Sequence, residues 1–285
     1  MAEEQEACNN KAKITLRYLF IVILCLLSFG MQAQVSICSW NLANFGNSKS
    51  EEEIVFIAAQ LRQFDIVAIE EVMAGNGGPD AVIRLCEALN QAGHKWRYSI
   101  SEPTSSYENR QQRERYAFIW KEERVILEDT AVLSAQFEKE IEREPFIATF
   151  SYEKKKFAVA AFHALPKKKQ PEREIKYLQY LFHPENGIPL LFVGDFNCPA
   201  SHTVFLPLKE KGYRQALQQQ KTTLKQECKA GECLASEYDN IFYPSAKVKL
   251  KNAGVLPFHQ SFANDMKKAR QLSDHLPVFA IFSLN

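Results

Sequence analysis

The sequence predicts an α/β or α+β fold with two β-sheets in a single domain. Helix-like and strand-like segments are mixed along the chain, and several strand-like segments follow one another directly. The strand count is high enough for two sheets. No internal repeat, low-complexity tract or Pro/Gly/Ser-rich linker divides residues 34–285. The 285-residue chain is 46% hydrophobic, which is enough to bury one large core.

The first half of the domain is expected to alternate strands with helices. A strand is predicted over residues 35–40, and a second, buried one over residues 66–69. Between them, Ser50 and Glu53 form a capping box that begins a helix. Apolar residues then recur at helical spacing, at Ile54, Ile57, Ala58 and Leu61.

A second helix is predicted to begin at Pro79 and to end just before Gly93. Its apolar face carries Val82, Leu85, Cys86 and Leu89. A third helix begins at Pro171, with Ile175, Leu178 and Phe182 on one face. The remaining apolar runs predict strands at residues 96–100, 116–120, 146–152, 157–162 and, approximately, 190–194, 239–243 and 277–283.

The first 33 residues have the pattern of a secretory signal peptide. Lys11, Lys13 and Arg17 precede a short apolar run at residues 19–27, and Ala33 provides a small residue for cleavage before Gln34. The run is too short for a comfortable membrane span, which needs about 20 residues. We therefore expect a signal peptide over residues 1–33 and a secreted or periplasmic domain over 34–285, with an uncleaved anchor as the alternative.

The net charge and the cysteines limit which partners, disulfides and metal sites the chain can have. The net charge of +1 shows no overall basic excess, so an anionic partner would have to meet local clusters such as residues 167–169. Cys38 and Cys86 are expected as buried thiols, while Cys228 and Cys233 could close the loop between them. Cys198 could pair with either loop cysteine, and no Cys/His spacing resembles a zinc site.

Two motifs at strand ends carry the strongest chemical signal. Gly194-Asp195-Phe196-Asn197 ends one buried run, and Ser273-Asp274-His275-Leu276-Pro277 precedes another. Carboxylate, amide and imidazole groups at these places suit a divalent metal and a phosphate, and they are poor choices for a core.

Other polar residues occupy the ends of predicted strands in the same way. Each has an ordinary structural interpretation when taken alone, such as a cap, a turn or a solvated surface position. Together they indicate a site, because α/β folds build their sites at strand ends. These residues are Asn41, Glu70, Glu71, His163 and Asp239.

In this order, the motifs resemble the endonuclease/exonuclease/phosphatase superfamily, and most closely its secreted deoxyribonuclease I branch. The superfamily resemblance rests on Trp40-Asn41, Glu71-Val72, His163, Tyr238-Asp239 and the two motifs above. The closer resemblance rests on Ser101-Glu102-Pro103, residues 113–118 and Arg143-Glu144-Pro145. It covers about residues 35–283, and it implies a four-layered αββα sandwich of two mixed β-sheets flanked by helices.

The resemblance also implies roles for individual residues. His163, oriented by Glu102, and His275, oriented by Asp239, would be the two acid/base groups. Magnesium or manganese would bind at Glu71, with Asn41, Asp195 and Asp274 completing or bordering the site. Asn197 would hold the scissile phosphate beside the catalytic Asp195, and Arg143 would contact a DNA phosphate.

The implied function is endonucleolytic hydrolysis of DNA to 5′-phosphate ends by a monomer, with no protein partner. A phosphatase or phosphodiesterase acting on a lipid or inositol phosphate is the alternative within the superfamily, and a catalytically inactive binding module is a third reading. Two positions depart from deoxyribonuclease I, which has arginines where this chain has Ala43 and Met73. The family often has Gln at the position of Glu70, which could add charge to the metal site or face solvent.

Overall fold

Two β-sheets lie face to face at the centre of the domain. The computed structural model describes residues 34–91, 93–106, 113–181, 187–263 and 265–284, and the unit considered below is Val35–Asn285. The expected signal peptide lies outside the described residues. Among the helices of the described part, none is both long and apolar enough to cross a membrane.

The first sheet has six strands, and its only parallel pair among the described residues lies at its centre. Along the chain the strands are β1 (Val35–Phe45), β2 (Ile66–Met73), β3 (Trp96–Ile100), β4 (Glu114–Lys121), β14 (Val248–Val255) and β15 (Val278–Leu284). Their spatial order is β14-β15-β1-β2-β4-β3. β1 and β2 run parallel, and every other neighbouring pair is antiparallel.

The second sheet repeats this plan. Its strands are β5 (Ile126–Leu127), β6 (Val132–Leu133), β7 (Phe146–Tyr152), β8 (Lys155–His163), β9 (Leu190–Asp195), β10 (Tyr213–Gln215) and β13 (Asp239–Pro244). The order is β10-β13-β9-β8-β7-β5, with β6 also paired to β7. Again one central pair, β8 and β9, is parallel. A separate hairpin is formed by β11 (Leu224–Lys229) and β12 (Glu232–Leu234).

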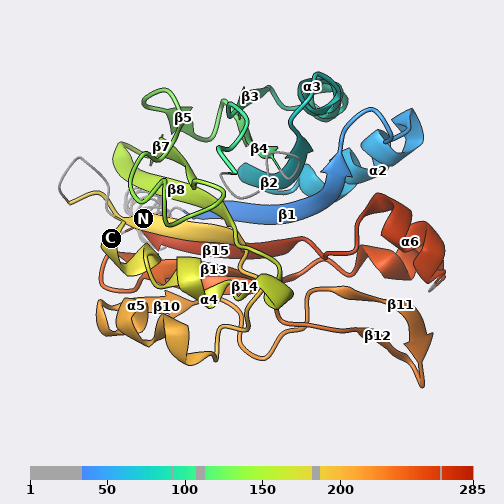
Figure 1. The fold of residues 1–285 in the computed structure, drawn as a ribbon. Coiled ribbons are helices and arrows are strands. Elements are labelled where there is room, and N and C mark those ends of the chain that lie inside the picture. The colour runs from blue at the N-terminus through green and yellow to red at the C-terminus, as the bar shows by residue number, and fades with distance from the viewer. Residues whose placement is uncertain (1–33, 92, 107–112, 182–186, 264, 285) are drawn as a thin grey trace, which may run out of the picture. The chain divides into compact units, whose positions relative to one another are not determined.

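Helices cover the outer face of each sheet, which confirms the αββα layers (Figure 1). One side holds α2 (Glu51–Leu61), α3 (Gly77–Asn90), α6 (Met266–Leu272) and the 3-10 turn η5 (Phe258–Phe262). The other holds α4 (Glu172–Ile175), α5 (Leu206–Glu210), η3 (Leu178–Tyr180) and η4 (Thr203–Phe205), with η2 (Lys167–Lys169) nearby in the chain.

Aromatic side chains fill the space between the sheets. Phe118 of the first sheet meets Phe146 and Phe150 of the second, with ring centroids 5.3 and 5.8 Å apart. Tyr243 and Phe282 make a similar contact at 5.2 Å. Burying one such side chain contributes about 1.5–3 kcal/mol, so this layer holds the two sheets in a fixed alignment. The strand ends of both sheets therefore meet at a common edge.

The predicted strands are all present, and the capping box of Ser50 and Glu53 is formed. The third helix is shorter than predicted: α4 ends at Ile175 and a 3-10 turn follows at η3, while the predicted Phe182 lies outside the described residues. Neither α6 nor β14 is predicted by the sequence pattern. β14 lacks a strong apolar pattern because most of its residues are exposed or half-buried.

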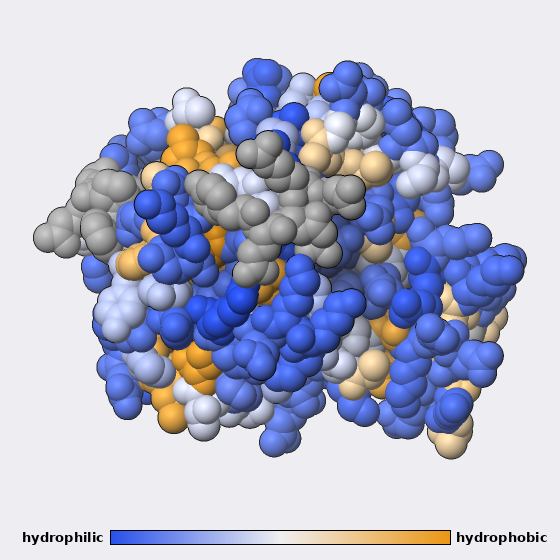
Figure 2. Space-filling model, viewed as in Figure 1, coloured by the Kyte–Doolittle hydropathy of each residue, from blue (hydrophilic) through white to orange (hydrophobic). Residues whose placement is uncertain are grey.

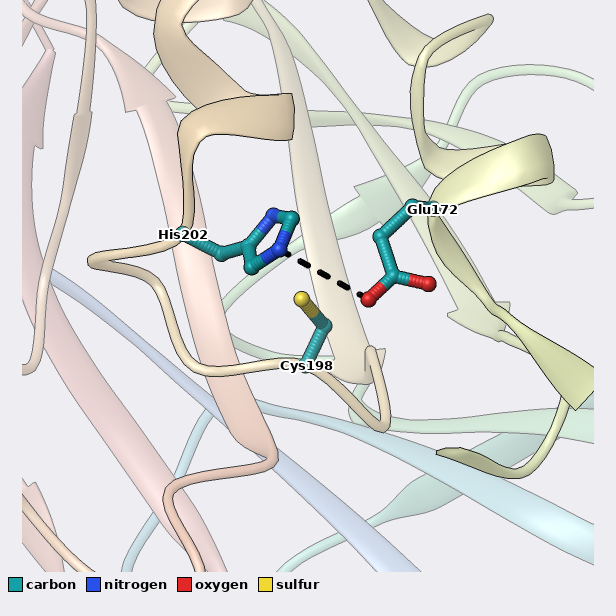
Figure 3. A group of neighbouring side chains, drawn as sticks. All are labelled: Glu172, Cys198 and His202. Carbon is teal, nitrogen blue, oxygen red and sulfur yellow. Dashed lines mark ion pairs between the residues drawn. The ribbon is translucent and has the colours of Figure 1, made fainter. Parts of the chain in front are cut away.

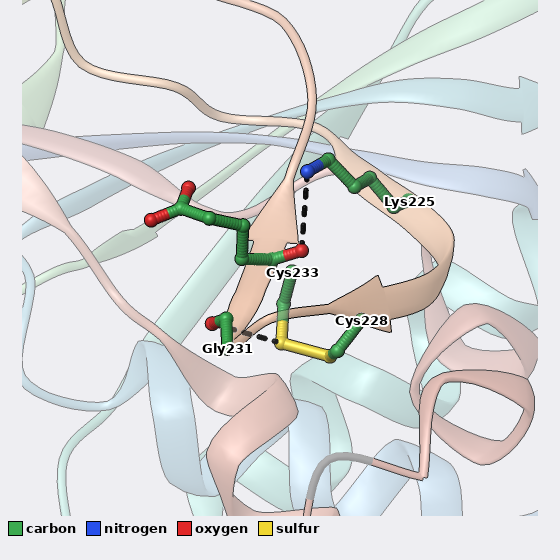
Figure 4. Close-up of a disulfide and its surroundings, with 5 residues drawn as sticks. Lys225, Cys228, Gly231 and Cys233 are labelled. Atoms are coloured by element: carbon green, nitrogen blue, oxygen red, sulfur yellow. Dashed lines mark hydrogen bonds between the residues drawn. A yellow bond between two sulfur atoms is a disulfide. The ribbon is translucent and has the colours of Figure 1, made fainter.

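The cysteines largely follow expectation. Cys228 and Cys233 form a disulfide that closes the tip of the β11–β12 hairpin (Figure 4). Cys38 and Cys86 are buried free thiols. Cys198 is also a buried free thiol, so its suggested pairing with a hairpin cysteine is wrong.

The surface is polar where it can be seen. On the face shown in Figure 2, hydrophilic residues predominate and hydrophobic residues are scattered in small groups. Small, separate apolar groups are normal on a folded protein and need no partner to cover them.

Candidate active site

Strand ends from both sheets bring the predicted site residues together. The carboxyl ends of β1, β2, β8 and β9 carry Asn41, Glu71, His163 and Asp195. β13 is antiparallel to β9, so its first residue, Asp239, pairs with Asp195, while the parallel β8 aligns His163 with Asp195. Asp195 is therefore the central residue of the site.

The backbone takes unusual conformations where the site is built. Glu71 and Asn197 have φ values of 57° and 48°, in the left-handed region that few non-glycine residues adopt. Gly194 has a φ of 136°, and a Cβ atom there would lie 2.1 Å from the carbonyl oxygen of Phe162. Only glycine allows β8 and β9 to approach this closely immediately before Asp195.

Two imidazoles face Asp195, and each is held by its own carboxylate. His163 Nδ1 lies 2.8 Å from Glu114 Oε1, and His275 Nδ1 lies 2.9 Å from Asp239 Oδ2. The opposite ring atoms point inward: His163 Nε2 and His275 Nε2 lie 3.5 and 3.6 Å from the same oxygen, Asp195 Oδ2. The two Nε2 atoms thus flank one buried carboxylate.

The carboxylate that orients His163 is Glu114, and the prediction that Glu102 does so is wrong. The Glu102 side chain is 88% exposed, and its ion-pair partner is Arg115, 3.6 Å away. Glu114 lies on the inner face of β4 with Tyr116, whose hydroxyl accepts a hydrogen bond from the His163 backbone N–H. The predicted pairing of His275 with Asp239 is confirmed.

The pKa of both imidazoles is raised. Burial alone would lower the pKa of His275, but Asp239 and Asp195 outweigh burial and hold it well above its usual value. For His163, burial and the nearby Arg143 lower the pKa, and Glu114 and Asp195 more than compensate. Both rings therefore hold a proton more tightly than a free imidazole does, which favours the acid role of either ring.

Residues outside the predicted set position His275 and Asp239. Thr222 Oγ1 donates a 2.5 Å hydrogen bond to Asp239 Oδ2 and accepts hydrogen bonds from the backbone N–H groups of Tyr238 and Asp239. Ser273 Oγ donates to the Asn41 carbonyl and accepts from His275 N–H. No sequence motif indicates Thr222, whereas Ser273 is the first residue of the Ser273-Asp274-His275-Leu276-Pro277 motif.

Oxygen donors for a divalent cation lie beside the imidazoles. Asn41 Nδ2 donates to Glu71 Oε1 at 3.0 Å, and Asn44 N–H donates to Glu71 Oε2. Glu71 borders a cleft of about 450 Å³. The Glu71 carboxylate on this cleft fits Mg²⁺, which keeps several waters and takes one or two carboxylates. Asn41 Oδ1, the amide oxygen beside it, accepts a hydrogen bond from Ala43 N–H. Asp274 stands at the edge, where it pairs with Arg270 at 3.1 Å.

The two predicted phosphate-binding residues differ in their availability. Asn197 is half-buried, and its Nδ2 donates to the Ala164 carbonyl and to Asp195 Oδ2. Arg143 is buried: it bonds to Glu114 Oε2 and to the Ala164 carbonyl, and its Nε has no partner among the described residues. Its ion pair with Glu114 neutralises that carboxylate. Arg143 also lines the cleft beside Glu71.

Glu70, which could have faced solvent, is fully buried beneath the site. Ser39 Oγ donates to its Oε1 at 2.6 Å, while its Oε2 has no partner among the described residues. Burial, together with the nearby Asp239 and Asp195, raises the pKa of Glu70 well above its usual value of 4.5. The raised pKa means that this position disfavours the charged form of Glu70, so the carboxyl holds its proton more tightly than a free one does.

Replacing Glu70 with Gln is expected to make the protein more stable, and increasingly so as the pH rises. The unfolded chain ionises Glu70 above its usual pKa while the folded chain retains the proton, so wild-type stability falls between the two pKa values. The variant lacks this loss, which amounts to about 1.4 kcal/mol per pH unit. Urea unfolding of both proteins between about pH 5 and pH 8 measures it. A difference independent of pH would contradict the assignment.

Comparisons with known proteins agree with this geometry. The model of the Endonuclease/Exonuclease/phosphatase family matches residues 38–275. A deoxyribonuclease from Thioalkalivibrio sp. (strain K90mix) is 30% identical over 93% of this chain and 75% of its own length. Human deoxyribonuclease gamma is 27% identical, covering 92% and 90% of the two chains.

Solved structures show the same fold. A crystal structure of an endonuclease/exonuclease/phosphatase family protein from Bacteroides thetaiotaomicron superposes with a TM-score of 0.62 at 15% sequence identity. The superposition covers 88% of this chain and 98% of that one.

Proposed function

This chain belongs to the endonuclease/exonuclease/phosphatase family and is a hydrolase of phosphodiester bonds, and from that premise we propose that it is an exported, metal-dependent endodeoxyribonuclease. The observation that carries the proposal is the arrangement around Asp195: two imidazoles, each held by a carboxylate, direct their Nε2 atoms at one buried oxygen. Hydrolysis of a phosphodiester needs one group that takes a proton from water and one that gives a proton to the leaving oxygen.

His163 and His275 take these two roles. Glu114 and Asp239 hold the rings with Nε2 inward and stabilise the protonated imidazoles, because each carboxylate bonds to Nδ1. Asn197, on the loop beside Asp195, offers an amide for the scissile phosphate. Each acid/base group contributes on the order of 10²–10⁴ to the rate.

Glu71 and Asn41 are the residues that would hold Mg²⁺ or Mn²⁺, with Asp195 and Asp274 at the border of the site. When bound, the cation supplies positive charge that offsets the charge developing on the phosphate oxygens. The names of the relatives, deoxyribonuclease and deoxyribonuclease gamma, support DNA as the substrate. The signal-like N-terminus supports export.

Supercoiled plasmid tests this function. The purified protein with Mg²⁺ is expected to nick the plasmid, and EDTA is expected to stop nicking because the oxygen donors alone cannot offset the phosphate charge. DNA ligase should reseal the nicks without end repair, since hydrolysis leaves 5′-phosphate and 3′-hydroxyl ends.

The same preparation is to be offered sphingomyelin and inositol phosphates. Turnover of one of these, with no EDTA-sensitive nicking of the plasmid, would replace the nuclease assignment with a phosphatase or phosphodiesterase of the same family. The missing arginines at Ala43 and Met73 make this comparison necessary, because they leave the cleft with fewer cations for a DNA backbone.

A further inference from the structure

A second group of metal-ligating side chains lies away from the imidazole pair. Glu172 is the first residue of α4, Cys198 lies in the loop after β9, and His202 caps the start of η4. One ligand atom from each lies within 4.8 Å of the other two. Figure 3 shows the His202 ring and the Glu172 carboxylate facing each other, with the Cys198 sulfur beside them.

The local fold explains how Cys198 and His202 meet. Three residues separate them, and His202 N–H donates to the Pro199 carbonyl at 2.8 Å, which closes a turn. This turn brings both side chains to the same side of the loop, opposite the start of α4 (Figure 3). The sequence did not indicate a zinc site because the third ligand, Glu172, lies 26 residues earlier in the chain.

We propose that Glu172, Cys198 and His202 form a binding site for Zn²⁺, with water as the fourth ligand. Thiolate, imidazole and carboxylate are the three protein ligands that zinc takes, whereas magnesium takes oxygen almost exclusively. The site is therefore distinct from the oxygen-rich site at Glu71 in both place and chemistry. It also goes beyond the proposed nuclease activity and does not depend on it.

The distances between the proposed ligand atoms are close to those in a tetrahedral zinc site. Bonds of about 2.0–2.3 Å in a tetrahedron place ligand atoms roughly 3.5 Å apart. His202 Nε2 and Glu172 Oε1 are already 3.7 Å apart. The distances from these atoms to the Cys198 sulfur are at most 4.8 Å, so they need to shorten by about 1.3 Å at most. The thiol is buried, but His202 and Glu172 are 37% and 25% exposed, which leaves an approach for the ion and a water.

Two interactions of the proposed ligands must be broken before zinc can bind, and both are weak. Lys167 Nζ bonds to Glu172 Oε1 at 2.7 Å, but the Lys167 side chain is 51% exposed and can move into solvent. Such a surface pair changes an equilibrium constant by about fivefold or less. His202 Nδ1 accepts a 3.2 Å hydrogen bond from Val204 N–H, which is lost when the ring proton moves to Nδ1 for Nε2 to bind metal. Losing that bond lowers the zinc affinity by about tenfold. Structural zinc sites bind the ion so tightly that a loss of this size does not prevent binding.

Zinc binding would release a proton from Cys198. Burial and the neighbouring Glu172 raise the pKa of the thiol to about 11, with Lys167 acting in the opposite direction. The group is therefore a thiol at neutral pH, and forming the zinc–sulfur bond breaks the S–H bond and sends one proton to the buffer. An occupied site would tie the loop that follows Asn197 to α4.

Cobalt(II) tests the site because it replaces zinc and shows a sulfur-to-cobalt charge-transfer absorption only when a thiolate is bound. The full-length protein is to be titrated with Co²⁺ in saturating Mg²⁺, so that the oxygen site is filled. We expect the band to saturate at one equivalent, to disappear when one equivalent of Zn²⁺ is added, and to appear with release of one proton. No band, or a band without proton release, would overturn the proposal.

Variants identify the ligands. Cys198→Ser is expected to abolish the band, and His202→Gln and Glu172→Gln to weaken Co²⁺ binding at least about tenfold. Cys86→Ser is the matched control, because Cys86 is also a buried free thiol whose pKa burial raises to about 11. A band that survives in Cys198→Ser or is lost in Cys86→Ser would contradict the site. If Cys198→Ser does not fold, His202→Gln decides: unchanged Co²⁺ affinity in that variant would overturn the proposal.

Discussion

Replacing Glu114 with Gln is expected to lower the rate of plasmid nicking by about 10²–10⁴, because His163 loses the carboxylate that orients it and favours its protonated form. The same substitution leaves the buried guanidinium of Arg143 without its counter-charge. Breaking a buried ion pair in this way costs about 3–5 kcal/mol of unfolding free energy. The rate is therefore to be measured at a temperature where circular dichroism shows that the variant is folded.

Glu102→Gln is the matched control for this experiment. Glu102 is a neighbouring acidic residue with an exposed side chain, so its loss is expected to change the unfolding free energy by less than about 0.5 kcal/mol and to leave the nicking rate nearly unchanged. A large loss of activity in Glu102→Gln with little effect in Glu114→Gln would show that the pairing in the structure is not the one used in catalysis.

Asp195→Asn is expected to have an effect of similar size on activity and to change both imidazoles together. The carboxylate of Asp195 helps to raise the pKa of His163 and of His275, and its Oδ2 lies within 3.6 Å of both Nε2 atoms. Without that charge, both pKa values fall and each ring loses its proton at a lower pH. The nicking rate should decrease by at least about 10²-fold.

Histidine ring resonances in NMR spectra, recorded in EDTA over a pH series, measure the two pKa values directly. The signals of His163 and His275 should both titrate at lower pH in Asp195→Asn. If only one of the two rings shifts, Asp195 does not lie between them as the structure has it, and the shared-carboxylate arrangement is incorrect.

The burial of Glu114 is predictable from the alternation of side chains along β4. Residues 114, 116, 118 and 120 share one face of β4, because side chains alternate along a strand. Tyr116, Phe118 and Trp120 on that face point into the layer between the sheets. Glu114 therefore had to be a buried carboxylate with a partner. The family resemblance points to Glu102 instead, because it locates the segment but does not determine the direction of the side chain.

Other features depend on contacts that no local pattern contains. Glu70 and Glu71 are adjacent, yet one is buried and the other borders the cleft, because the left-handed backbone at Glu71 ends the regular alternation of β2. Thr222 reaches Asp239 across 17 residues of chain through a 2.5 Å hydrogen bond. In contrast, the central strands such as β8 and β9 could be predicted, because the apolar runs that form them are buried on both faces of a layered fold.

In the proposed mechanism His163 and His275 form one acid/base pair around Asp195, and the nicking rates of alanine variants measure whether both are needed. His163→Ala and His275→Ala are each expected to lower the initial rate on supercoiled plasmid with Mg²⁺ by about 10²–10⁴. His94→Ala, which removes an exposed imidazole, should retain the wild-type rate. If either His163→Ala or His275→Ala nicks DNA as fast as the His94→Ala protein, the two histidines are not the acid and base of the reaction, and the proposed mechanism is wrong.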